Sequence, residues 1–172
     1  MNLQPCYDFS ARHLLTQNVQ CSSNGQCVCQ QDSLRCALAC LAVENDVTSY
    51  GNRNGDIPSI NLFVAANEDL TLLDSLINIH DRSSPNNWPA KLHKLALKHG
   101  LQPFSSSDLQ GRRGKVNPLS VWYTNSTQRE RLLEAHKIAG TESLLADYLK
   151  AFPLDTSGIR ESVLPTESQG VV

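Results

Sequence analysis

The chain of 172 residues lacks a long hydrophobic run, because its longest one is the short stretch 36–43. A helix that crosses a bilayer needs about 20 consecutive apolar residues, and the mean hydropathy of −0.31 is too polar for an integral membrane protein. The N-terminal residues show neither the basic region nor the apolar region of a secretory signal. We therefore expect a cytoplasmic protein.

The sequence also lacks a large excess of either positive or negative charge, since the formal net charge is −2. Such a chain has no general attraction for nucleic acids or anionic membranes, so we expect a protein partner instead. A glycine-rich phosphate loop, a serine nucleophile elbow and a paired acidic catalytic motif are all missing from the sequence. Polar loops at 45–58 and 102–115 could present a binding surface. These features favour a non-enzymatic accessory or regulatory protein that binds another macromolecule.

The spacing of apolar residues predicts a mainly α fold, a single helical domain over residues 1–153 and a flexible tail over 154–172. About five helices are expected, with a small β-hairpin near residues 19–29 around Asn24-Gly25. The stretch 34–43 is almost wholly apolar, which predicts a helix at the centre of the core. Residues 119–123 are expected to form a short strand or a buried extended segment. The helical segments are 8–18, 34–43, 60–79 with a break near 67–69, 87–100, 126–140 and 141–153.

Five of the six cysteines lie between residues 21 and 40. Cys27 and Cys29 on a hairpin strand, with Cys36 and Cys40 one helical turn apart, could together bind zinc. Residues one apart on a strand point to opposite faces, however, and cysteine also packs well among alanine and leucine. We expect buried thiols and no metal cofactor, with a structural zinc site, disulfides and an iron–sulfur cluster as the alternatives.

A small cysteine-dependent hydrolase is the alternative enzymatic hypothesis. It would use Cys36 as the nucleophile, near the start of its helix, and His80 or His99 as the base. The pair His80-Asp81 resembles the paired ligands of metal phosphohydrolases, but we interpret it as the C-terminal end of a helix leading into a loop. Thiol reactivity separates the two functions, because a hydrolase needs one cysteine with a low pKa.

A short basic stretch, Arg112-Arg113-Gly114-Lys115, lies in the second polar loop. Arg112, Arg113 and Lys115 are the candidate binding residues, since three cations could grip a phosphate. Without interleaved aromatic residues the pattern is also typical of a solvated loop.

Two segments carry a resemblance to a known family. Residues 11–15 (ARHLL) and 35–42 (RCALACLA) are similar to the opening of a small uncharacterised domain found in bacterial and phage genomes. In that family a helix containing Cys-Leu-Gly-Ala-Leu follows a polar turn, and an Asn-Asp pair precedes a later helix. Here Ala39 replaces the glycine and His80-Asp81 replaces the pair. The resemblance covers at most residues 11–100 and implies a microbial or viral origin, without functional residues.

Overall fold

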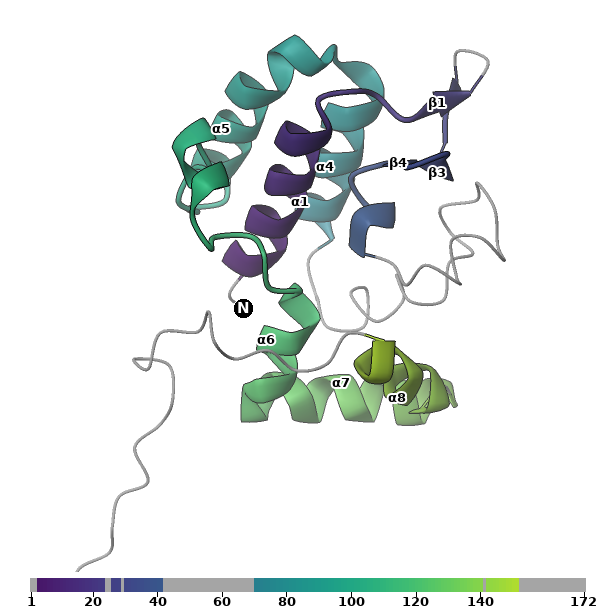
Figure 1. Ribbon diagram of the computed structural model, residues 1–172. Coiled ribbons are helices and arrows are strands. Elements are labelled where there is room, and N and C mark those ends of the chain that lie inside the picture. The colour runs from purple at the N-terminus through teal and green to yellow at the C-terminus, as the bar shows by residue number, and fades with distance from the viewer. Residues whose placement is uncertain (1–2, 24–25, 29, 42–69, 141, 152–172) are drawn as a thin grey trace, which may run out of the picture.

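The computed structural model describes residues 3–23, 26–28, 30–41, 70–140 and 142–151 (Figure 1). The described part is mainly helical and also contains short antiparallel strands, which confirms the mainly α fold class with a small β-hairpin. Within it, no helix combines the length and the apolar character needed to cross a membrane. The loop 45–58 and the tail 154–172 lie outside the described residues. The α-helices of the described residues are α1 Gln4–Gln17, α4 Thr71–Arg82, α5 Trp88–Lys98, α6 Pro118–Thr124, α7 Ser126–Ala139 and α8 Glu142–Ala151.

Four two-residue strands follow α1 and form two hairpins. The first pairs β1 (Ser22–Ser23) with β2 (Gln26–Cys27), which is the predicted hairpin. The second pairs β3 (Gln30–Gln31) with β4 (Leu34–Arg35) and was not predicted. Its turn includes Asp32 in the left-handed region, at a φ of 53°. Asp and Asn tolerate this conformation because their side chains bond locally to the backbone.

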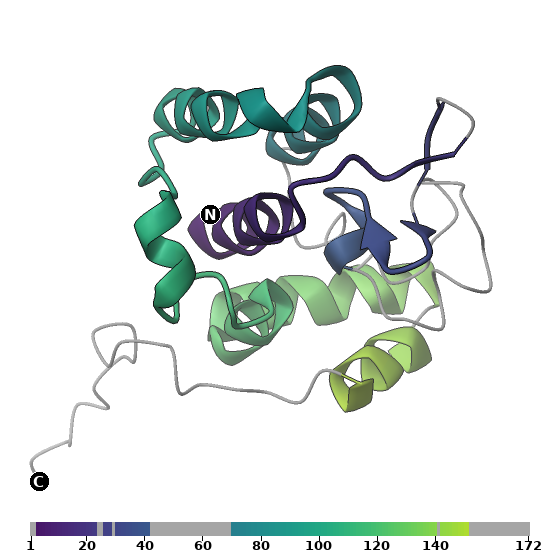
Figure 2. The ribbon, with the colours of Figure 1, turned by 45° about the horizontal axis from the view of Figure 1, so that its top comes forward.

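Helix α1 is the central element of the fold. Figure 2 shows it with α4 and α5 on one side and α6 and α7 on the other. One face of α1 contributes Cys6 to a core that includes residues of α6, α7 and α8. Another face contributes Tyr7, Ala11 and Leu14 to a second core shared with α4 and α5. The chain therefore builds two hydrophobic layers around its first helix.

Hydrogen bonds from Tyr7 join this helix to distant parts of the chain. Its buried hydroxyl donates to the carbonyl oxygen of Leu92, 3.1 Å away, and accepts a hydrogen bond from the amide of Phe104, also at 3.1 Å. A buried tyrosine needs such partners because an unpaired hydroxyl in the core is costly. Tyr7 thereby fixes α1 against both α5 and the chain that follows it.

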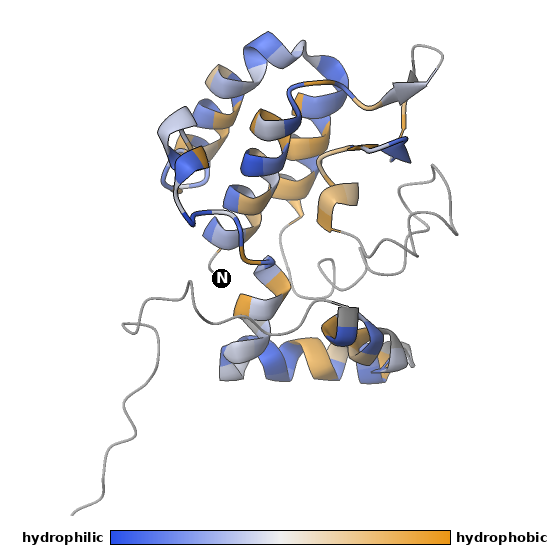
Figure 3. Ribbon diagram, in the orientation of Figure 1, coloured by the Kyte–Doolittle hydropathy of each residue, from blue (hydrophilic) through white to orange (hydrophobic). Residues whose placement is uncertain are grey.

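The prediction of a helix over residues 34–43 was wrong. Leu34 and Arg35 belong to β4, and the described remainder ends in a single 3₁₀ turn, η1 (Ala39–Leu41). Burial was predicted correctly, since every residue from Cys36 to Leu41 is buried, and Figure 3 colours η1 as hydrophobic. An uninterrupted apolar run shows that a segment is buried but not which secondary structure it adopts.

The expected strand at 119–123 is instead part of α6. The side-chain oxygen of Asn117 accepts a hydrogen bond from the Leu119 amide at 3.0 Å, and Pro118 begins the helix. Proline is favoured at a first helical position, because it has no amide proton to satisfy there. The dipeptide Asn117-Pro118 was therefore the helix signal in the sequence.

Among the described residues, two further 3₁₀ segments connect the helices. They are η3 (Pro85–Asn87), between α4 and α5, and η4 (Ser106–Gln110), between α5 and α6. The latter belongs to the polar connection 102–115, which packs against α1. This contact brings the predicted basic residues close to the N-terminal helix.

Candidate functional site

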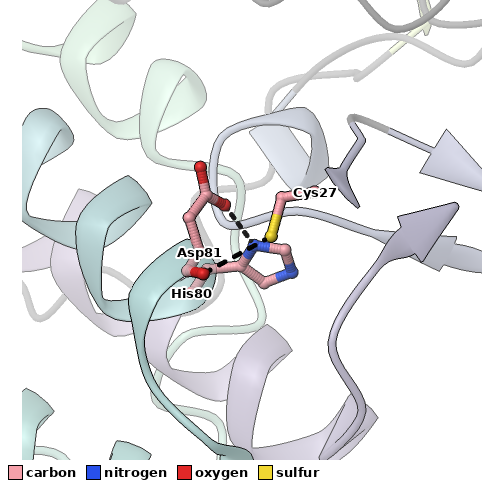
Figure 4. A group of neighbouring side chains, drawn as sticks. All are labelled: Cys27, His80 and Asp81. Atoms are coloured by element: carbon pink, nitrogen blue, oxygen red, sulfur yellow. Dashed lines mark hydrogen bonds and ion pairs between the residues drawn. The ribbon is translucent and has the colours of Figure 1, made fainter. Parts of the chain in front are cut away.

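Three side chains with possible chemical roles converge where the first hairpin meets the end of α4. Cys27 comes from β2, while His80 and Asp81 lie in the last turn of α4. Their ligand atoms all lie within 4.8 Å of one another, and Figure 4 shows the three side chains together. We refer to them as the Cys27 cluster.

Both ring nitrogens of His80 have hydrogen-bond partners. The backbone amide of Cys21 donates to Nε2 at 3.1 Å, and Nδ1 lies 2.7 Å from Oδ1 of Asp81. Because an amide N–H can only donate, Nε2 must be the acceptor. The proton of the neutral ring is therefore on Nδ1 and is donated to the carboxylate. The ring is fully buried and stacks on Trp88 at a centroid distance of 5.7 Å.

Hydrogen bonds from Gln20 and the contact of Cys27 with Asp81 anchor the first hairpin to the C-terminal end of α4. The side-chain amide of Gln20 donates to the carbonyl oxygens of His80 at 2.8 Å and Asp81 at 3.0 Å. The Cys27 thiol lies 3.6 Å from the Asp81 carbonyl oxygen and 3.2 Å from the Gln20 nitrogen. The last carbonyls of a helix have no intrahelical donors, so these side chains satisfy groups that would otherwise be unpaired. The cluster thus has a structural role.

Nucleophilic catalysis at this cluster would need a different arrangement. In a catalytic triad the nucleophile and the carboxylate contact opposite nitrogens of the histidine. Here Asp81 occupies Nδ1 and the Cys21 amide occupies Nε2. In addition, burial, followed by the nearby charge of Asp81, raises the pKa of the Cys27 thiol. A raised pKa reduces the fraction of the reactive thiolate.

The hydrogen bonds also oppose a metal ion on His80. A metal on Nδ1 would require the ring proton to move to Nε2, where it would face the Cys21 amide proton. A metal on Nε2 would displace that amide, which is buried in the structure. The donor set contains the residue types that a transition metal uses, but both ring nitrogens of His80 are already engaged in hydrogen bonds.

The structure does not bring the predicted hydrolase residues together through hydrogen bonds. Cys36 is buried, and its sulfur accepts a hydrogen bond from the Ala39 amide at 3.3 Å. The nitrogens of His80 contact Cys21 and Asp81 instead. His99 lies at the C-terminal end of α5, and its buried Nε2 has no hydrogen-bond partner.

Of the four cysteines of the alternative zinc site, Cys27, Cys36 and Cys40 lie in the described part of the chain, and among the described residues the possible metal-binding group contains only Cys27 of these three. Cys27 belongs to the cluster above, whereas the Cys40 thiol lies 3.1 Å from the Ala37 carbonyl oxygen. Cys29 lies outside the described residues. Burial raises the pKa of Cys40, and it raises that of Cys21 to about 11. The described cysteines are thiols.

Among the predicted binding residues, Arg113 has an internal role. Its guanidinium pairs with Asp8 at 2.7 Å and with Asp108 at 3.2 Å, and lies 5.1 Å from the ring centroid of Phe104. The next residue, Gly114, packs so closely on α1 that an added Cβ would lie 2.4 Å from the Asp8 carbonyl oxygen. Arg113 therefore fastens the connection 102–115 to α1, while Arg112 and Lys115 remain exposed.

A pocket of about 350 Å³ lies beside α1, and Lys115 is one of the residues that line it. It is within the size range of small-ligand sites. None of the described residues that line it is acidic. We call it the α1 pocket, and the side chains relevant to binding are Phe9, Arg12, His13, Thr16, Arg35 and Lys115.

Two of these side chains are fixed by backbone contacts. The guanidinium of Arg12 donates to the carbonyl oxygens of residues 108, 109, 111 and 113. Nε2 of His13 lies 3.0 Å from the Arg35 carbonyl oxygen, and since a carbonyl only accepts, this nitrogen carries a proton. Burial, and then the positive charge of Arg35, lower the pKa of His13 despite that hydrogen bond.

The α1 pocket was not predicted from the sequence, although one of its walls has a recognisable spacing. Phe9, Arg12, His13 and Thr16 have the three- and four-residue spacing of one helical face. That spacing was a usable signal within α1. It did not reveal that Arg35 and Lys115 would complete the site, because this depends on tertiary contacts.

Comparison with known proteins gives no relative: no family model, no curated protein and no solved structure matches the chain.

Proposed function

We propose that this protein is a non-enzymatic accessory or regulatory protein that binds a partner protein through an anionic group of that partner. The observation that carries the proposal is the α1 pocket, which collects Arg12, Arg35 and Lys115 without an acidic lining residue. The overall charge of −2 offers no general attraction for nucleic acid. A local cationic pocket in such a chain favours recognition of one defined group.

The Cys27 cluster supports the non-enzymatic part of the proposal. His80 is held by hydrogen bonds at both nitrogens, and the neighbouring thiol has a raised pKa. Hydrolysis by a cysteine needs the opposite conditions, namely an available base and a stabilised thiolate. The cluster instead keeps the hairpin attached to α4.

The proposed setting is the cytoplasm of a bacterium, with the gene of bacterial or phage origin. The resemblance over residues 11–100 supports the origin. The described cysteines are thiols, which is the form that reducing compartments maintain.

Charge reversal at the pocket tests the binding function. The immobilised full chain is exposed to lysate of the native host, and captured proteins are quantified for wild type, Lys115→Glu and the control Lys94→Glu. Both lysines are exposed, and Lys94 lies on α5. We expect a specific protein whose capture falls about tenfold only in Lys115→Glu, the loss expected for about 1.4 kcal/mol of binding energy. Equal capture by all three chains would refute a binding role for the pocket.

A further inference from the structure

We propose that the α1 pocket recognises a phosphate monoester, carried on a phosphorylated side chain of the partner protein. This inference rests on the proposed function and specifies the chemical group that the pocket binds. Free phosphate esters share the same chemistry, so the experiment below separates the two sources.

The charge of the pocket matches a dianion better than a carboxylate. Arg12 and Lys115 bring two positive charges to one cavity that Arg35 also lines, and no described lining residue is acidic. A phosphate monoester carries about −1.5 to −2 charges at neutral pH, whereas a carboxylate carries only one. The second negative charge of the phosphate strengthens binding most where several cations surround the ligand.

Arg12 supplies a fixed charge to this site. Its guanidinium is held by four backbone carbonyl oxygens of the connection 102–115, and it forms no ion pair with a carboxylate in the described part of the chain. Carbonyl groups satisfy its N–H donors without cancelling its charge. Arg12 therefore contributes a positive field that needs no rearrangement when an anion enters.

Lys115 and Thr16 supply the hydrogen-bond donors. Both are exposed and line the pocket, and Lys115 has no ion-pair partner among the described residues. An ammonium group offers three donors on a flexible stem, which suits phosphate as a point charge. Phe9 adds an apolar wall that can contact the carbon group attached to the phosphate.

Phenyl phosphate is the appropriate probe because it combines the dianion with an apolar ring. It is titrated into the isotope-labelled full chain, and amide shifts are followed by NMR, with inorganic phosphate and benzoate titrated in parallel. The variant Lys115→Met removes the charge and keeps the length of the side chain, and Lys94→Met is the matched control on α5. Circular dichroism verifies that both variants remain folded.

We expect saturable binding of phenyl phosphate with a Kd near the millimolar range that is usual for so small an anion, about 1 mM. Benzoate should bind at least about tenfold more weakly, and Lys115→Met should weaken phenyl phosphate about tenfold, as expected for one charge-assisted hydrogen bond. Lys94→Met should leave the affinity unchanged. Shifts that do not saturate, equal affinity for benzoate, or an unaffected Lys115→Met variant would each overturn the inference.

A second arm distinguishes this inference from the binding function itself. Host lysate is treated with phosphatase before the capture experiment, and we expect the Lys115-dependent partner to be lost. If capture depends on Lys115 but survives phosphatase, the proposed function stands and the phosphate inference fails. If phenyl phosphate binds in the pocket while capture is the same for wild type and Lys115→Glu, the pocket binds a free phosphate ester, and both the partner-borne phosphate and the proposed function fail.

Discussion

Among the described glycines, Gly114 should be the one whose replacement by alanine destabilises the fold most. The residue has a φ of +72°, and an added Cβ would lie 2.4 Å from the Asp8 carbonyl oxygen and 3.1 Å from Cβ of Arg12. Ordinary contact begins at 3.4 Å, so the connection 102–115 and α1 would have to separate by about 1 Å. The substitution therefore perturbs a contact between two backbone segments.

The magnitude follows from the contacts that this separation would stretch. A left-handed alanine costs about 1–2 kcal/mol. The separation would also lengthen the 2.7 Å ion pair between Arg113 and Asp8 and the bonds from Arg12 to the same connection. Each hydrogen bond to a charged group contributes about 1.5–3 kcal/mol, so we expect Gly114→Ala to lower the free energy of unfolding by about 3–5 kcal/mol.

Two other glycines provide matched controls for the backbone strain alone. Gly100 and Gly140 have φ values of +65° and +67°, and an added Cβ at either position meets no atom within 4 Å. Alanine at either site should therefore cost only the backbone strain of about 1–2 kcal/mol. Urea unfolding followed by circular dichroism measures all three variants, and parallel transitions allow their midpoints to be compared. If Gly114→Ala is as mild as Gly100→Ala, the close packing against α1 described above is incorrect.

Three further predictions concern the thiols and the buried histidines. The purified protein should contain no stoichiometric zinc, because the hydrogen bonds at His80 oppose a metal; elemental analysis that finds about one zinc per chain, lost together with the fold on chelation, would contradict this. No described cysteine should react rapidly with iodoacetamide before unfolding, since burial raises the pKa of Cys6 to about 12 and that of Cys21 to about 11. A single rapidly reacting cysteine, identified by mass spectrometry, would restore the hydrolase hypothesis. The pKa of His13 is lower in the folded chain than its ordinary value of 6.5, so the unfolded state binds the proton first as the pH falls. The contribution of His13 to stability should therefore be complete above pH 6.5 and decline below it, and His13→Gln should reduce that decline in urea unfolding at several pH values. An unchanged pH dependence would argue against a partly buried, neutral His13 ring.

The sequence predicted best the elements whose ends carry local signals. The predicted helical segments 87–100 and 126–140 end at Gly100 and Gly140, and both glycines adopt the left-handed conformation just after α5 and α7. A glycine ends a helix through the backbone conformation of a few neighbouring residues, so this helix end can be predicted without knowing the tertiary structure. The segment 34–43 carried only a hydrophobic signal, which correctly indicated burial and wrongly indicated a helix.

The candidate site was less predictable because its parts come from distant segments. Arg113 pairs with Asp8, which lies 105 residues away, and this contact converts a predicted binding residue into a structural one. Lys115, two residues later, has a different environment in the α1 pocket. Likewise, nothing local indicated that Cys27 rather than Cys36 would lie beside His80. Pairings of this kind follow from tertiary contacts.

The contacts of Tyr7 have a consequence for the order of events during synthesis. Its hydroxyl forms hydrogen bonds with the carbonyl of Leu92 and the amide of Phe104. These contacts of the first helix cannot form until residues 85 and 97 positions later have been synthesised. At about 5–20 residues per second, this interval is roughly 4–20 s. During that time Tyr7, Ala11 and Leu14, all fully buried in the native state, have no partners from α5 to cover them. The nascent chain thus exposes its most central helix first and encloses it last, which makes this interval the period when chaperones would protect it.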